Sequence, residues 1–153
     1  AKVLREFSGV EHRIEPVATV DGVRWFNDSK ATNPESSIKA LEAFAGQVIL
    51  IAGGRDKNTD LSEFMKLVKQ KVDQLILIGE AAARFAAAAQ TAGVENIVQA
   101  DSLAEAVETA RRLALAPQVV LLSPACASYD MFDNYEQRGR IFKQLVRKEE
   151  QRG

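Results

Sequence analysis

The stretch Gln47-Val48-Ile49-Leu50-Ile51-Ala52-Gly53-Gly54 is a continuous apolar run that ends in two glycines. An apolar run without polar alternation is typical of a strand buried on both faces of a parallel sheet. The next segment, residues 61–71, places Leu61, Phe64, Leu67 and Val68 at the three- and four-residue spacing of an amphipathic helix. A buried strand followed by a helix is the repeating unit of an α/β fold.

The same alternation continues on both sides of this stretch. His12 to Val20 and Val23 to Asp28 are predicted to form a hairpin, because Asp21-Gly22 favours a type I′ turn. Further strands are expected over 75–78, 96–100 and 119–122, and helices over 34–44, 80–92, 102–115 and 135–149. The prediction is an α/β, Rossmann-like doubly wound sheet of six strands, with the first antiparallel, five parallel through right-handed crossovers, and helices on both faces.

Composition limits the partners of this chain. Its 153 residues suit one domain, with 46% apolar and 27% charged residues, and 20 basic residues against 21 acidic ones leave no field that would attract nucleic acid or membrane. No apolar run has the length of a membrane span, no signal peptide is recognised, and a single cysteine suits a reducing compartment. We expect a cytoplasmic monomer that binds neither nucleic acid nor membrane.

Polar residues gather after three of the expected strands. Because parallel strands end on the same edge of a sheet, the loops that follow them lie together where α/β proteins bind ligands. These loops are Asp28–Thr32, Gly53–Lys57 and Ser123–Ser128. After the first loop, Asn33 is predicted to be a helix N-cap and Pro34 the first helical residue. The sequence therefore predicts a site for a small charged ligand.

Each loop also admits a structural explanation. Gly53-Gly54 permits backbone N–H groups to face an anion beside Arg55 and Lys57, but a tight turn with solvated charges is equally consistent. Ser128 suits hydrogen bonding to a carboxylate, although close packing and capping are the commoner roles. Neither a P-loop nor a Gly-x-Gly-x-x-Gly motif occurs, which disfavours independent nucleotide hydrolysis and dinucleotide binding.

The single cysteine and the single histidine do not indicate a nucleophilic or metal-binding site. Cys126 is an unpromising nucleophile, because the only histidine, His12, is distant in sequence and no Cys-His motif surrounds either residue. A lone histidine is more often structural than catalytic, and no metal-ligand cluster accompanies it. Arg13 is able to bind phosphate bidentately, although a surface ion pair is the default.

Five motifs resemble the C-terminal domain of the Mur ligases, and among them the members that add D-glutamate. They are Gly9-Val10-Glu11-His12-Arg13, the octet Asn27–Pro34, Gly53-Gly54-x-Asp56-Lys57, Leu121–Ser128 and Asp130-x-Phe132-x-Asn134-Tyr135-Glu136-x-Arg138-Gly139. The resemblance covers nearly the whole chain in order.

The resemblance implies a three-domain cytoplasmic enzyme of peptidoglycan synthesis, in which residues 1–153 form the C-terminal amino-acid-binding domain. An N-terminal domain would bind the UDP-sugar, and a central domain would carry the P-loop, most of the ATP contacts and the Mg²⁺ ligands. The implied reaction converts the carboxylate of UDP-N-acetylmuramoyl-L-alanine to an acyl phosphate, which the amine of D-glutamate attacks. The isolated domain is expected to be inactive, to position substrate rather than supply catalytic residues, and to hold no metal.

Carried over residue by residue, the resemblance implies that D-glutamate is bound by Thr32, Lys57, Ser128 and Tyr135. Arg13 would reach the phosphates of ATP, and Asp28 its ribose hydroxyls. His12, Lys30, Asn33 and Arg138 match motif positions as possible supporting residues. Tyr135 stands where phenylalanine is expected, and Asn58 where a glycine often follows the lysine, which Asn58 can replace in a left-handed conformation.

Other functions remain open at this point. A sibling ligase would add a different amino acid, but the Asn-Pro-Arg loop expected of a diaminopimelate-adding member is missing. A folylpolyglutamate synthase shares the fold and the glutamate substrate, although the octet Asn27–Pro34 fits it poorly. A stand-alone, non-catalytic ligand-binding module is the alternative from another class.

Overall fold

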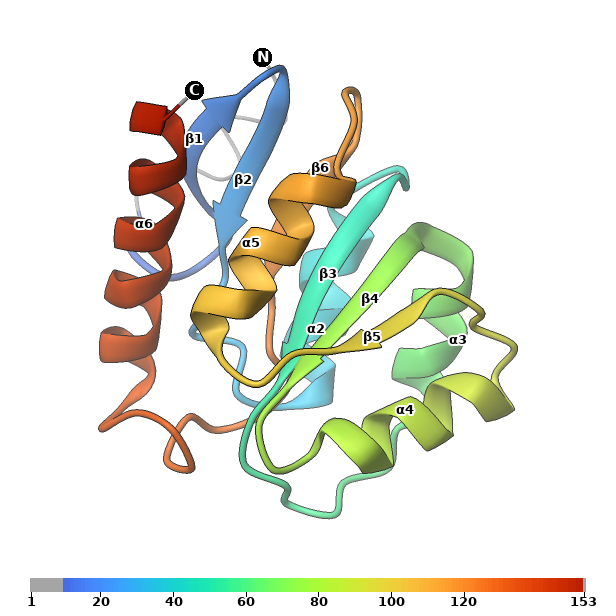
Figure 1. The fold of residues 1–153 in the computed structure, drawn as a ribbon. Helices are drawn as coiled ribbons and strands as arrows, with labels where there is room; N and C mark the ends of the chain where they lie inside the picture. The colour runs from blue at the N-terminus through green and yellow to red at the C-terminus, as the bar shows by residue number, and fades with distance from the viewer. Residues whose placement is uncertain (1–9, 153) are drawn as a thin grey trace.

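A computed structural model describes residues 10–152 and contains the six strands expected from the sequence (Figure 1). The strand order is β1-β2-β6-β3-β4-β5. β1 pairs antiparallel with β2, and every other pair is parallel, which confirms the predicted sheet. The strands are β1 Glu15–Val20, β2 Val23–Asn27, β3 Val48–Gly53, β4 Val72–Ile78, β5 Ile97–Gln99 and β6 Val119–Leu122.

Helices cover both faces of this sheet, as predicted (Figure 1). One face carries α2 (Pro34–Glu42), α3 (Ser62–Lys71) and α4 (Ala82–Thr91), and the other carries α5 (Leu103–Leu113) and α6 (Tyr135–Arg152). Within residues 10–152, no helix is both long enough and apolar enough to cross a membrane.

β3 explains why the fold needs two helical layers. Leu50 belongs to the core beneath α2, α3 and α4, whereas Ile49 and Ile51 belong to the core beneath α5 and α6. All three side chains are at most 1% exposed. Since burial of each such side chain contributes about 1.5–3 kcal/mol, the unbroken apolar run stabilises both layers at once.

The first strand begins later than predicted. His12 and Arg13 precede β1 instead of opening it, and the strand starts at Glu15. The backbone of His12 (φ 67°) and Ile14 (φ 44°) is left-handed, which interrupts an extended chain. The Asp21-Gly22 turn has positive φ at both residues, as type I′ requires. Gly9, which opens the first motif, lies outside the described residues.

Boundaries of the other elements shift by a few residues. β4 starts at Val72, directly after α3, because Val72 pairs with Val48 although the following Asp73 is polar. The helices expected over 34–44, 80–92 and 102–115 are shorter, and the one expected over 135–149 continues to residue 152. Ser102 caps α5 from outside the helix by accepting from the Glu105 amide.

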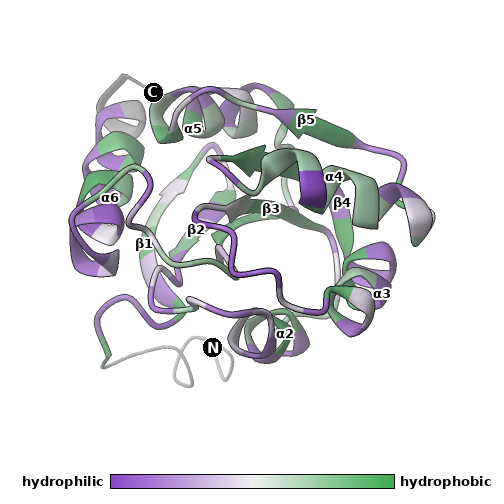
Figure 2. Ribbon diagram, turned by 90° about the horizontal axis from the view of Figure 1, so that it is seen from below, coloured by the Kyte–Doolittle hydropathy of each residue, from purple (hydrophilic) through white to green (hydrophobic). Residues whose placement is uncertain are grey.

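Strand order determines where the three polar loops lie. β6 is the common neighbour of β2 and β3, so the loops after these strands emerge side by side from the middle of the sheet. Figure 2 looks onto this edge, where the loops that cross the view are largely hydrophilic. Topology thus confirms that the polar loops share one edge.

A candidate ligand site at the carboxyl edge of the sheet

Backbone hydrogen bonds join the three loops into one surface. The Ala125 amide donates to the Ala31 carbonyl at 3.0 Å, and the Arg55 amide donates to the Ala127 carbonyl at 2.9 Å. Gly54 has no room for a side chain, because an added Cβ would lie 2.5 Å from the Ala127 carbonyl oxygen. Gly54 therefore permits the close approach of these two loops.

Asp28 is buried at the end of β2 and is held by neighbouring donors. Its Oδ1 accepts from the Ile14 amide at 3.1 Å, and its Oδ2 accepts from the Ser123 hydroxyl at 2.6 Å. Burial raises the pKa of this carboxyl to about 7, against the opposing effect of the two hydrogen bonds and of Arg13. The carboxyl of Asp28 therefore changes charge near neutral pH.

A pocket of about 260 Å³ opens beside Asp28. Three cationic side chains contribute to its lining, Arg13 from the turn before β1, Lys30 from the β2–α2 loop and Lys39 from α2. None of the three forms an ion pair with a carboxylate in the described part of the chain. Cations gathered around a small pocket suit a phosphate-bearing ligand.

Two of the predicted amino-acid-binding residues meet across the loops. The Lys57 ammonium donates to the Thr32 carbonyl at 3.3 Å and is otherwise exposed. Ser128 is buried in the adjoining loop, directly after Ala127, which pairs with Arg55. Thr32, Lys57 and Ser128 thus belong to loops that are bonded to one another.

Arg84 of α4 holds the loop that carries Lys57. Arg84 forms an ion pair with Asp56 at 3.0 Å and donates to the Thr59 carbonyl at 2.8 Å. Asn58 has φ 56°, which confirms the left-handed conformation expected of it. These contacts orient the backbone on both sides of Lys57.

Tyr135 is the first residue of α6 and contacts two other parts of the site. Its carbonyl accepts from the Ser29 hydroxyl at 2.8 Å, and its ring meets the edge of His12 with centroids 6.0 Å apart. Asn134 caps the helix by accepting from the Gln137 amide. The N–H of Tyr135 belongs to the first helical turn, whose amides have no intrahelical partner and are available to an anion.

His12 fastens α6 against the end of β2. Its Nδ1 lies 2.9 Å from the Asn27 amide nitrogen, its carbonyl accepts from Lys30, and burial lowers the pKa of its ring. Gly139 permits this contact, because a Cβ there would overlap the His12 ring and crowd Asn27. His12 accordingly has the structural role that the sequence favoured.

The two glutamates of a candidate metal cluster near His12 are already paired with a lysine. Glu11, His12 and Glu15 place ligand atoms within 4.8 Å of one another. However, the buried Lys143 ammonium lies 2.7 Å from Glu11 and 3.2 Å from Glu15. A metal ion would have to displace this ammonium, so we assign no metal to the cluster.

Cys126 is unsuited to nucleophilic chemistry. Its side chain is buried, and burial raises the pKa of the thiol to about 12, outweighing the lowering by Arg138. The thiol is therefore protonated at neutral pH, whereas the thiolate is the nucleophile.

Three residues of the site were missed or left without a role by the sequence. Lys39 lies one helical turn after Ser36, and that spacing is the signal that places both on the pocket. Ser29 and Arg138 are joined across more than a hundred residues, and no local pattern signals such a contact.

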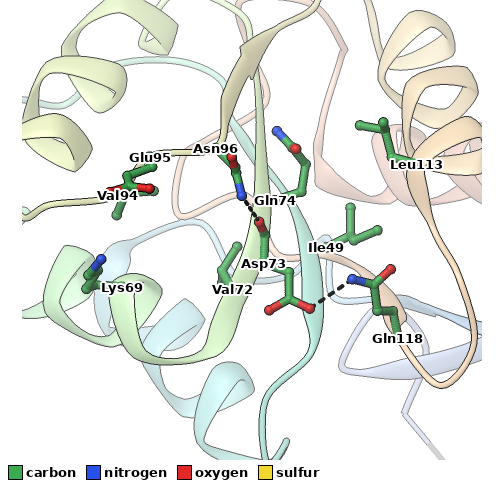
Figure 3. Close-up of a pocket in the computed structure, with 10 residues that line it drawn as sticks. All are labelled: Ile49, Lys69, Val72, Asp73, Gln74, Val94, Glu95, Asn96, Leu113 and Gln118. Carbon is green, nitrogen blue, oxygen red and sulfur yellow. Dashed lines mark hydrogen bonds between the residues drawn. The ribbon is translucent and has the colours of Figure 1, made fainter.

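Figure 3 shows a second pocket, of about 460 Å³, at the opposite edge of the sheet. Two of its polar side chains bond within the lining: Gln118 donates to the Asp73 carboxylate at 2.8 Å, and Asn96 donates to the Asp73 backbone carbonyl at 3.0 Å. Paired polar groups of this kind give no reason to assign a ligand there.

Comparison with known proteins gives close relatives. The family described as "Mur ligase, glutamate ligase domain" matches residues 12–126. The UDP-N-acetylmuramoylalanine--D-glutamate ligase of Pelotomaculum thermopropionicum is 53% identical over 146 residues, covering 95% of this chain and 32% of the relative. The enzyme of that name from Desulfitobacterium hafniense (strain DSM 10664 / DCB-2) is 52% identical over 97% of this chain and 33% of its own length. The chain spans about a third of these relatives.

Solved structures share the fold at low sequence identity. Mycobacterium tuberculosis folylpolyglutamate synthase complexed with ADP has a TM-score of 0.64 at 13% identity, over 90% of this chain and 32% of that one. MurF ligase from Thermotoga maritima in complex with ADP has a TM-score of 0.59 at 16% identity, over 92% of this chain and 32% of that one. At these identities the likeness concerns the fold alone.

Proposed function

Because this chain belongs to the Mur ligase family, we propose that it is the amino-acid-binding domain of an ATP-dependent ligase that adds D-glutamate to UDP-N-acetylmuramoyl-L-alanine. The observation that carries the proposal is the 53% identity to a D-glutamate ligase over 95% of the chain. The relatives are about three times as long, which leaves room for UDP-sugar and ATPase domains. The reaction would belong to cytoplasmic peptidoglycan synthesis.

D-Glutamate would bind where the three loops meet. Lys57 supplies an ammonium for one carboxylate, and the hydroxyls of Thr32 and Ser128 supply donors of the kind a dicarboxylate needs. The backbone N–H of Tyr135 adds a donor at the start of α6, so the exchange of phenylalanine for tyrosine leaves this contact intact. The contact of Lys57 with the Thr32 carbonyl supports this arrangement.

ATP would reach the pocket lined by Arg13 and Asp28 from the central domain. Arg13, with Lys30 and Lys39, offers positive charge to the phosphates, and Asp28 offers an acceptor to the ribose. ATP supplies the phosphoryl group that activates the substrate carboxylate. Asp28 already accepts two hydrogen bonds, and no other carboxylate among the described residues lines this pocket. The Mg²⁺ ligands would belong to the central domain.

The contribution of this domain would be positioning. Holding the amine of D-glutamate against the acyl phosphate makes the step effectively unimolecular, an effect worth up to roughly 7–11 kcal/mol in favourable cases. Because the acyl phosphate lies on other domains, the domains must close over both reactants. We expect residues 1–153 alone to show no ATP hydrolysis and no amide formation, as measured by phosphate release and product chromatography.

An NMR titration of the ¹⁵N-labelled chain tests the proposal. D-Glutamate is expected to shift the amides of Thr32, Lys57 and Ser128, L-glutamate to do so more weakly, and ATP to shift those of Arg13 and Asp28. Shifts confined to the opposite edge, around Asp73 and Gln118, would refute the site. A preference for L-glutamate would instead favour a folylpolyglutamate synthase.

A further inference from the structure

The guanidinium of Arg138 lies beneath the loops of the candidate site. It reaches there from α6 and is 1% exposed. Its Nε donates to the Ser29 hydroxyl at 2.9 Å, its Nη2 to the Ser29 carbonyl at 2.8 Å, and its Nη1 to the Cys126 carbonyl at 3.0 Å. One side chain therefore bonds both the loop after β2 and the loop after β6.

The third loop contacts the same group. A Cβ added to Gly54 would lie 3.4 Å from Nη1 of Arg138. Gly54 in turn packs against the Ala127 carbonyl, and its own carbonyl accepts a hydrogen bond from the Ala81 amide. The guanidinium consequently lies where all three loops converge.

The acceptors of Arg138 are unusual for a buried cation, because all of them are neutral. Burial lowers the pKa of this guanidinium to about 10, so it remains charged at neutral pH. No carboxylate of the described residues lies at hydrogen-bonding distance from it. Burying a cation in this way opposes folding unless its hydrogen bonds compensate for the lost hydration. The planar guanidinium fork of Arg138 donates to two loops at fixed angles and so provides such hydrogen bonds.

We propose that Arg138 is a positioning residue that sets the spacing between Thr32 and Ser128. Ser29 lies three residues before Thr32, and Cys126 lies two residues before Ser128, so the fork determines how far apart their loops stand. The inference rests on the proposed function for its ligand, D-glutamate. It predicts that Arg138 matters more for a ligand that spans two loops than for one bound mainly beside a single loop.

The pocket of about 260 Å³ beside Asp28, where phosphate groups are proposed to bind, serves as the comparison site. Asp28 is fixed by Ser123 and Ile14, and Lys30 by the His12 carbonyl, so this pocket has its own supports. The test measures binding of D-glutamate and of inorganic tripolyphosphate to wild type, Arg138→Met and Arg138→Lys. The control is Lys143→Met, which removes another buried cation from α6 on the side of Glu11 and Glu15.

We expect Arg138→Met to weaken D-glutamate binding about tenfold or more while tripolyphosphate binding changes less than about threefold. Arg138→Lys keeps the charge but lacks the fork, and is expected to resemble Arg138→Met. Lys143→Met is expected to lower the melting temperature with D-glutamate affinity unchanged. Equal weakening of both ligands in Arg138→Met, or full rescue by lysine, would overturn the inference.

A measurement without ligand separates this inference from the proposed function. Hydrogen exchange is read at the Ala125 and Arg55 amides, which join the loops, and at the β3 amides as reference. Arg138→Met is expected to accelerate exchange at the inter-loop amides selectively. If wild type does not bind D-glutamate but this acceleration is seen, the loop-spacing role stands and the ligand is wrong. Unchanged exchange at Ala125 and Arg55 would overturn the role itself.

Discussion

Replacing Asp28 by asparagine tests the electrostatics of the candidate site most directly. The carboxyl lies between the Ile14 amide and the Ser123 hydroxyl, and Ser123 lies 2.9 Å from the Ser37 hydroxyl. An asparagine fits the same space. Its oxygen can accept from Ile14, and its NH₂ can donate to Ser123, which then donates to Ser37 while Ser37 donates to the Ser123 carbonyl. The substitution therefore removes a charge and preserves the hydrogen bonds.

The expected magnitude follows from the raised pKa. The pKa of the Asp28 carboxyl is about 7 in the folded chain and 3.8 as its ordinary value, so the folded state binds more protons between these values. The resulting stability is present at low pH and is lost as the pH rises through about 7. With 1.36 kcal/mol for each pKa unit, the wild-type chain loses about 2–3 kcal/mol of unfolding free energy from this group between about pH 5 and pH 8.

Urea unfolding at several pH values across this range measures the effect. Asp28→Asn is expected to lack this loss of stability, so the difference between variant and wild type grows in favour of the variant as the pH rises. Glu95→Gln, at the opposite edge of the sheet, serves as the control and is expected to follow the wild-type slope. A constant difference between Asp28→Asn and wild type at every pH would refute the reasoning.

Three further predictions concern other parts of the site. Lys57→Met is expected to weaken D-glutamate binding about tenfold in calorimetry without lowering the melting temperature, because Lys57 is exposed; an unchanged affinity would remove Lys57 from the site. Gly139→Ala is expected to cost about 1–3 kcal/mol in thermal unfolding, because its Cβ overlaps His12, and wild-type stability would contradict that packing. Cys126 is expected to resist a disulfide reagent until the chain is unfolded, since its thiol is buried; rapid labelling of the native chain would show otherwise.

The sequence predicted the sheet well where burial is unambiguous. Residues 48–52 have no polar interruption, so periodicity alone identified β3 and its burial on both faces. It failed at His12, because a left-handed backbone there depends on the Lys30 amide and on α6, which are distant in the chain. It also missed the start of β4, because tertiary pairing with β3 outweighs the polarity of Asp73.

The sequence predicted which residues belong to the candidate site and at which edge of the sheet they lie, but few of the contacts between them. The polar loops after parallel strands correctly predicted the edge of the sheet at which the candidate site lies. Asn33 correctly predicted the start of α2, because its side chain accepts a hydrogen bond from the Ser36 amide. The bonds of Arg138 to Ser29 and Cys126 were out of reach, because they depend on strand order, which a single sequence does not give. The binding roles of Thr32, Lys57, Ser128 and Tyr135 stay predictions.

The insertion of β6 between β2 and β3 has a consequence for biosynthesis. A nascent chain released only as far as residue 118 has β2 and β3 but lacks β6, the strand that joins them, so the surface of the candidate site is absent until β6 and the loop after it, residues 119–128, have emerged. Such long-range pairing is slow relative to local contacts. We therefore expect the β2 amides that bond to β6 and the β6 amides to gain protection together and late in pulsed hydrogen exchange during refolding. Protection of these β2 amides well before β6 would show that the geometry of the candidate site forms independently of β6.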